Sequence, residues 1–143
     1  MEAVRAVTAA QRAGAYYVRI HAMAVKHHIP LEMEIDHHDE TDAKHVIVLD
    51  DVLPVATGRI FPAADGAAQM GRIVVLPEYR RKGLGTMVVK ALEAWAAEMG
   101  YEKIILEARE NKTAFYESMG YAGDKSKTIY SEPFTCVYME KYL

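Results

Sequence analysis

A short basic stretch with two glycines has the composition of an anion-binding turn. It reads Arg80-Arg81-Lys82-Gly83-Leu84-Gly85-Thr86, and it lies between an apolar, β-branched run and a long amphipathic helical pattern. The N-terminus of a helix leaves backbone N–H groups without partners and carries a partial positive charge. Because Gly83 and Gly85 lack a Cβ, the backbone can bend sharply and approach a bulky phosphate. The stretch therefore indicates a phosphate site, with a plain basic turn as the alternative.

A second stretch carries a tyrosine that is suited to proton donation. Asn111 to Met119 predicts a short helix that Asn111 caps and Gly120 ends, and it contains Phe115 and Tyr116. A phenol with an unperturbed pKa of about 10 stays protonated at neutral pH and can act as an acid. The alternative is that both aromatic side chains only anchor the core.

The elements that must position these two stretches follow a mixed α/β order. Apolar residues at helical spacing predict a helix over 9–26, and a second helix follows the glycine loop until Gly100. A strand over 101–108, reached through that second helix, favours parallel pairing with the strand before the loop. The other expected strands are a weak one within 1–8, a hairpin of 44–49 with 52–61, the run 69–76, and two closing strands, 128–130 and 135–139.

The acidic, histidine-rich stretch 31–42 is too polar for a core, and we expect a loop or short helix on the surface. Its side chains also permit a second interpretation as a divalent metal site. The candidate ligands would be His27, His28, Glu34, Asp36, His37, His38 and Asp39. Adjacent histidines usually point apart and the cluster lacks a helical i, i+4 pair, so we expect solvated charges and no metal.

The bulk composition is that of one globular domain spanning residues 1–143, with 51% hydrophobic and 26% charged residues. A formal net charge of −3 argues against a nucleic-acid binder that neutralises phosphates. The single cysteine, Cys136, excludes an internal disulfide, and its apolar context predicts a packed residue. No signal peptide or run of about 20 apolar residues is present, so we expect a cytoplasmic protein without a membrane partner.

Three segments resemble one family. Residues 72–85 resemble the acetyl-CoA motif of the GNAT superfamily of N-acetyltransferases, whose signature Arg/Gln-x-x-Gly-x-Gly/Ala is matched by Arg80, Gly83 and Gly85. Residues 111–121 resemble the GNAT segment in which a short helix ends in Phe/Leu-Tyr-Glu-x-x-Gly-Phe. Residues 18–48 look like the N-terminal half of small bacterial GNAT proteins of the ElaA-like kind. The resemblance implies the GNAT fold, an α/β (α+β) architecture with a mixed, mostly antiparallel sheet, flanking helices and splayed parallel central strands.

The chain departs from the family pattern at two places. Many members carry an asparagine seven residues before the tyrosine that corresponds to Tyr116, where it contacts the pantetheine arm, but this chain has Arg109 there. Asn111, five residues before Tyr116, either serves that role from a shortened helix or caps the helix, and we favour the cap. ElaA-like proteins tend to carry Gly-Ile-Pro-His near the end, whereas this chain reads Ser-Glu-Pro-Phe over 131–134, so any function of that histidine is in doubt.

The resemblance implies transfer of an acetyl group from acetyl-CoA to a primary amine by direct attack in a ternary complex. In that reaction Tyr116 would protonate the leaving thiolate, and Glu107 stands where some GNAT enzymes place their base, with Glu34 and His45 as the other candidates. The implied cofactor-binding residues are Ile73, Val74, Val75, Arg80, Arg81, Lys82, Gly83, Leu84, Gly85, Thr86 and Asn111.

The acceptor and the partners are less determined. The acidic stretch 32–42 would suit a cationic amine, on a small molecule or a peptide. Two other functions stay open: a non-catalytic acyl-CoA-binding or sensor module on the same fold, and a plain interaction domain. The two β-rich segments of the tail could also supply an edge for a homodimer.

Overall fold

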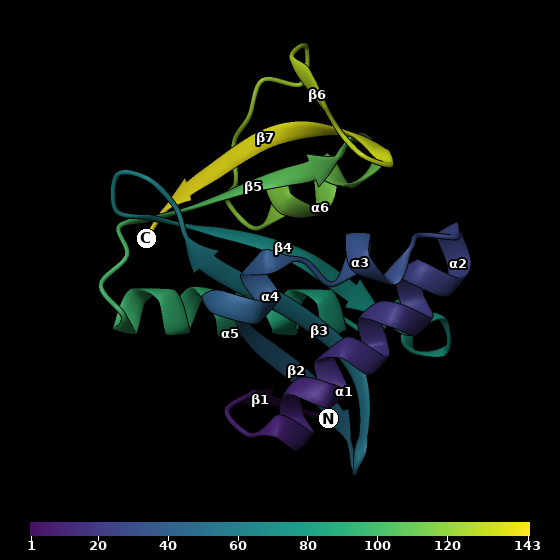
Figure 1. Cartoon of the computed structure of the whole chain (residues 1–143). Coiled ribbons are helices and arrows are strands. Elements are labelled where there is room, and N and C mark those ends of the chain that lie inside the picture. Colours follow the sequence, from purple (N-terminus) through teal and green to yellow (C-terminus); the bar gives the residue numbers. More distant parts are fainter.

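The computed structural model describes residues 1–143 and contains one seven-stranded sheet with the order β1-β2-β3-β4-β5-β7-β6 (Figure 1). Neighbouring strands are antiparallel except β4 and β5, which are parallel, as the helical crossover between them predicted. The strands are β1 (Glu2–Arg5), β2 (Lys44–Asp50), β3 (Leu53–Pro62), β4 (Ala67–Val75), β5 (Lys103–Arg109), β6 (Thr128–Ser131) and β7 (Phe134–Tyr142).

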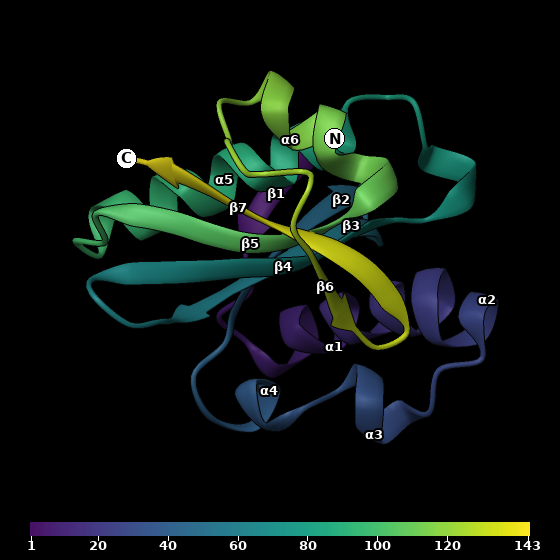
Figure 2. The same cartoon turned by 90° about the horizontal axis from the view of Figure 1, so that it is seen from above.

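Helices cover both faces of the sheet. Figure 2 shows α5 and α6 on one face and α1 to α4 on the other. The helices are α1 (Ala9–Arg19), α2 (Val25–His27), α3 (Leu31–Glu34), α4 (His37–Thr41), α5 (Leu84–Glu98) and α6 (Thr113–Ser118). A wider π-helical turn, Ile20–Ala24, joins α1 to α2, so the predicted first helix is confirmed as one helical segment. No helix is long and apolar enough to cross a membrane.

Helix α5 packs closely on the sheet because one strand lacks a side chain beneath it. Its buried face carries Val88 and Leu92, at the spacing that the sequence predicted. A Cβ added at Gly58 of β3 would lie 2.6 Å from Val88 Cγ1 and 2.9 Å from Leu92 Cδ1. The absent side chain therefore lets the helix approach the sheet just after the glycine loop.

The parallel strands β4 and β5 stay together for only part of their length. Their register runs from Ala67 opposite Lys103 to Met70 opposite Leu106, while β4 continues beside β3 until Val75. Arg72 has a left-handed φ of 54°, and the β3–β4 register shifts at the same place, which marks a β-bulge. Residues 71–75 therefore have no strand partner on the β5 side, and the strands diverge (Figure 1). The expected mixed, mostly antiparallel sheet with splayed parallel central strands is confirmed.

Candidate active site

The glycine loop lies where β4 ends, beyond the point at which β4 separates from β5. Helix α5 begins at Leu84, its N-cap is Gly83 with φ 76°, and no side chain caps it. The N–H groups of its first turn are therefore available to an anion. Arg81 also has a left-handed φ, of 64°, and Arg80, Arg81 and Lys82 are all exposed and have no carboxylate partner. The structure thus forms the basic turn that the sequence predicted.

Helix α6 brings the second predicted stretch to this loop. A Cβ at Gly85, in the first turn of α5, would lie 3.4 Å from Phe115 Cζ, so the phenyl ring rests directly on the start of α5. Phe115 also packs edge-on against Tyr116, with 5.0 Å between the ring centroids. The two stretches that the sequence singled out are therefore neighbours.

Tyr116 is held by packing and not by a hydrogen bond. Its ring meets Tyr121 edge-on at 5.8 Å, and the Tyr121 hydroxyl donates to Glu93 Oε2 at 2.8 Å. The hydroxyl of Tyr116 has no such acceptor, and burial raises the pKa of Tyr116 to about 12. This phenol is therefore protonated at neutral pH, and its proton is not engaged by the protein.

Glu107 lies on β5 just past the last residue paired with β4. It is exposed and stands opposite Tyr138 of β7, so both side chains point to the face that carries α1 to α4. Arg109, two residues later, shares that face because strand side chains alternate. The structure therefore places Glu107 on the diverging arm, opposite the unpaired part of β4.

The interpretation of Asn111 as a helix cap is wrong. Asn111 lies inside a 3-10 turn, Glu110–Lys112, and the N-cap of α6 is Lys112, without a side-chain cap. The extra turn shortens the α-helix because β5 continues to Arg109 and the chain must reverse before α6 begins. Asn111 is exposed near the open end of β5.

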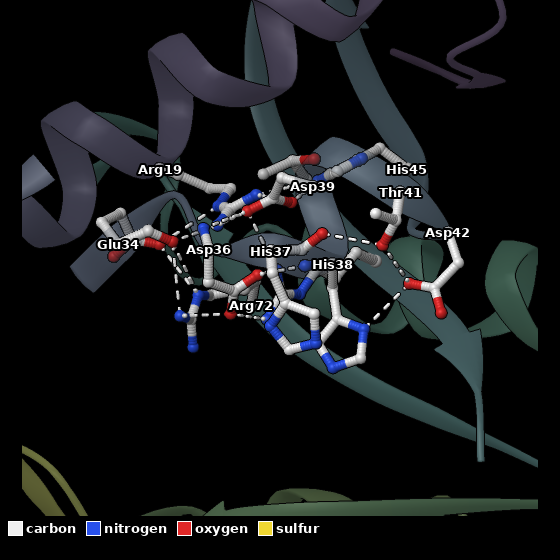
Figure 3. Close-up of polar contacts among 12 residues, drawn as sticks. Arg19, Glu34, Asp36, His37, His38, Asp39, Thr41, Asp42, His45 and Arg72 are labelled. Atoms are coloured by element: carbon white, nitrogen blue, oxygen red, sulfur yellow. Dashed lines mark hydrogen bonds and ion pairs between the residues drawn. The ribbon is translucent and has the colours of Figure 1, made fainter. Parts of the chain in front are cut away.

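The acidic stretch 31–42 forms two short helices at the surface, α3 and α4, as predicted, but the prediction that all its charges are solvated is wrong. Glu34 of α3 and Asp39 of α4 turn inward toward Arg19 of α1 (Figure 3), whereas Glu32 and Glu40 are exposed. Arg19 Nε lies 3.1 Å from Glu34 Oε2, and Arg19 Nη1 lies 2.7 Å from Asp39 Oδ1. The side chains of Arg19, Glu34 and Asp39 are 0%, 2% and 1% exposed, because each charge meets an opposite charge.

Two arginines of the sheet complete this group, which we call the buried ion network: Arg19, Glu34, Asp36, Asp39, His45, Arg59 and Arg72. Arg59 of β3 donates to both carboxylate oxygens of Asp36, at 2.7 and 2.8 Å. Arg72, at the bulge of β4, lies 3.0 Å from Glu34 Oε2. Three guanidinium groups thus balance three carboxylates, and the network ties α3 and α4 to the bulge.

The network explains the protonation states of its members. Burial would raise the pKa of Asp39, but hydrogen bonds from His45 and Arg19 outweigh it and hold that pKa well below its usual range. Burial lowers the pKa of His45, more than its hydrogen bond to Asp39 raises it. His45 Nδ1 is buried without a partner. Glu34 and His45, the two other candidate bases, are therefore enclosed in the network, and Glu107 alone of the three is exposed.

One cluster escaped the sequence prediction. The guanidinium carbon of Arg109 lies 3.9 Å from the ring centroid of Phe134 on β7, and His27 of α2 meets the same ring edge-on at 5.2 Å. The only signal in the sequence was the arginine at the family's asparagine position.

No group of His, Cys, Asp and Glu side chains is arranged to hold a metal ion. Cys136 is a buried free cysteine, which confirms its prediction as a packed residue.

Comparison with known proteins gives matches over most of the chain. Residues 9–121 match the family model described as "Acetyltransferase (GNAT) family". The N-acetyltransferase YjcF of Bacillus subtilis, itself uncharacterized, is 37% identical over 121 residues, which cover 85% of each chain.

Solved structures agree over nearly the full length. A candidate N-acetyltransferase of Lactobacillus plantarum has a TM-score of 0.90 at 26% identity, and covers 99% of this chain and 97% of its own. ElaA of Escherichia coli has a TM-score of 0.84 at 22% identity, and the match covers 99% of both chains. An aminoglycoside 6′-N-acetyltransferase complexed with coenzyme A has a TM-score of 0.79 at 14% identity, and the match covers 99% of this chain and 97% of that one. At this identity the similarity is one of fold alone.

Proposed function

Because this chain belongs to the acetyltransferase (GNAT) family, we propose that it transfers an acetyl group from acetyl-CoA to a primary amine, by direct attack in a ternary complex. One observation carries the proposal. The parallel strands β4 and β5 separate after Met70 and Leu106, and β4 then leads through a 3-10 turn, Pro77–Tyr79, and the basic glycine turn into an uncapped helix N-terminus. This arrangement offers an extended backbone edge followed by a turn suited to an anion. An elongated ligand that carries phosphates at one end could bind both.

The cofactor would lie along β4. The backbone of Ile73, Val74 and Val75, which β5 leaves unpaired, would hydrogen-bond the pantetheine arm like an added strand. One of these N–H groups would also polarise the thioester carbonyl. The pyrophosphate would bind the loop residues Arg80, Arg81, Lys82, Gly83, Leu84, Gly85 and Thr86, and Asn111 would lie beside the arm at the end of β5.

The chemistry requires one proton acceptor and one proton donor. The amine nitrogen attacks the thioester carbonyl carbon, and Glu107 accepts the amine proton directly or through a water. The carbon–sulfur bond then breaks, and Tyr116 donates to the sulfur as negative charge develops there. The hydroxyl of Tyr116 is protonated and is not engaged by another acceptor, which supports this role, because it can donate a hydrogen bond to the sulfur as negative charge develops there.

The first experiment is isothermal titration of the protein with acetyl-CoA. Gly83→Asp adds a carboxylate at the N-terminus of α5, and Gly100→Asp is its matched control at the other end of that helix. Both glycines have left-handed φ angles and no atom within 4 Å of an added Cβ, so the two variants carry equal backbone strain. We expect roughly micromolar binding by the wild type and by Gly100→Asp, and none by Gly83→Asp.

The other outcomes separate the competing functions. No binding by the folded wild-type protein would contradict the proposal. Binding without acetylation of any amine would instead favour a non-catalytic acyl-CoA sensor. Equal loss of binding in both variants would show that strain, and not the phosphate turn, controls affinity.

A further inference from the structure

The guanidinium group of Arg109 is held by packing on an aromatic ring and has no acidic partner. Its carbon lies 3.9 Å from the Phe134 ring centroid, so the planar group rests on the aromatic face. No carboxylate lies within ion-pair distance of it, whereas Arg19, Arg59 and Arg72 each have one. Arg109 also donates no hydrogen bond to the protein, and its nitrogens are not among the buried, unsatisfied polar atoms. Its N–H groups are therefore positioned and free at the surface.

Several basic groups lie near Arg109, alongside the carboxylates of Glu107 and Glu110. His27 packs on the same phenyl ring, and the charges that act on it most strongly are Arg109, Lys26 and Arg80, which together with burial lower the pKa of His27. Three carboxylates of the acidic stretch, Glu34, Asp36 and Asp39, are paired with arginines in the buried ion network and do not offset this charge. A second cationic group of the acceptor would be repelled by the Arg109 guanidinium if it lay against it.

One carboxylate does share this face of β5. Glu107 precedes Arg109 by two residues, so the two side chains leave the strand about 7 Å apart on the same side. Glu107 is exposed and has no ion-pair partner. The face thus presents a proton acceptor and, beside it, a free planar donor of the kind that binds carboxylates through two hydrogen bonds.

We propose that Arg109 binds a carboxylate of the acceptor, and that the acceptor is therefore a small amine that also carries a carboxylate, of the amino-acid type. This inference rests on the proposed acetyl transfer. The amine would face Glu107 while the carboxylate lies on Arg109, which orients the nitrogen toward the thioester. The inference departs from the expectation of a cationic amine, because Glu34, Asp36 and Asp39 of the acidic stretch are paired with arginines and only Glu32, Glu40 and Asp42 stay exposed.

The test compares acceptors that differ only at the carboxylate. Acetylation is measured for α-, β- and γ-amino acids, for their primary amides, and for diamines of matching length. The wild type should prefer amino acids to their amides by about 10- to 100-fold in kcat/KM, the range of a charge-assisted hydrogen bond. Arg109→Gln should remove this preference by lowering kcat/KM on the amino acids to the level measured on the amides, and its acetyl-CoA affinity, measured by isothermal titration, should match that of the wild type. Arg109→Lys should restore part of the preference.

The control is Arg12→Gln, which removes the same charge from an exposed position on α1 and should keep the preference. A wild type that prefers amides or diamines would overturn the inference while acetyl transfer stands. An Arg109→Gln variant that loses activity equally on all acceptors, or binds acetyl-CoA more weakly, would also overturn it. No acetylation of any amine by protein that binds acetyl-CoA would contradict the proposed function itself.

Discussion

Arg19 and Asp39 form a two-pronged ion pair inside the protein, with 2.7 Å between Nη1 and Oδ1 and 2.9 Å between Nη2 and Oδ2. The pair joins α1 to α4. Asp39 also accepts from the backbone N–H of Asp36 at 2.9 Å, and its Oδ2 lies 3.0 Å from Arg59 Nη1. One carboxylate therefore ties a helix on the surface to the sheet beneath it.

Replacing that carboxylate should destabilise the fold strongly. Asp39→Asn keeps the shape but leaves Arg19 and Arg59 with one negative charge fewer in a buried site. We expect a loss of about 3–5 kcal/mol in the free energy of unfolding, the usual effect of breaking a buried pair. Urea denaturation at pH 7 measures it.

The control is an ion pair on the surface. Lys125 and Glu117 lie 3.2 Å apart with side chains 58% and 41% exposed, so Glu117→Gln should cost less than about 1 kcal/mol. Similar losses in Asp39→Asn and Glu117→Gln would show that the buried ion network does not stabilise the protein.

His45 should make the stability depend on pH in the mildly acidic range. Its pKa in the folded protein is lowered, chiefly by burial, so the unfolded chain binds more protons once the pH falls below the unfolded pKa of about 6.5. The free energy of unfolding should therefore fall as the pH decreases from about 7 to 5. Urea denaturation across this range should give a steeper decrease for the wild type than for His45→Gln.

A surface histidine provides the comparison. His21 is exposed, and His21→Gln should retain the wild-type slope. If His45→Gln loses stability with falling pH as steeply as the wild type, then another group causes the effect.

Tyr116→Phe should reduce kcat by about 100-fold or more, because it removes the group that we propose as the proton donor to the sulfur. Its affinity for acetyl-CoA should stay unchanged, since packing alone holds the ring. Steady-state kinetics with any accepted amine gives kcat, and isothermal titration gives the affinity. Tyr130→Phe, at a side chain 70% exposed, is the control. An unchanged kcat would show that Tyr116 only packs in the core and does not donate a proton in the reaction.

Glu107→Gln should slow the reaction most at low pH. Without the base, transfer depends on the small fraction of amine that is already deprotonated, so the loss in kcat/KM should shrink as the pH rises. At neutral pH we expect a loss of about 100-fold or more. Glu110→Gln, at an exposed neighbouring carboxylate, should behave as the wild type. A loss in Glu107→Gln that is the same at every pH would point to a positioning effect.

Local patterns along the chain were sufficient to predict much of the fold. The helical spacing before and after the glycine loop gave α1 and α5, and the crossover through α5 gave the parallel β4–β5 pair. The glycine loop itself needed only its neighbours, because a left-handed Gly83 before a helix is a local feature. These predictions succeed because residues close in sequence decide them.

The placement of charge was decided only by the tertiary structure. Glu34 pairs with Arg19 and Arg72, which are 15 and 38 positions away, and without those partners a carboxylate belongs in water. Arg109, Phe134 and His27 likewise meet only because β7 pairs beside β5 and α2 lies on the same face. The sequence by itself determined the order of the elements and the basic glycine turn. The folded chain alone determined which charges are neutralised and which stay free, because a charge's environment depends on partners that the sequence does not place beside it.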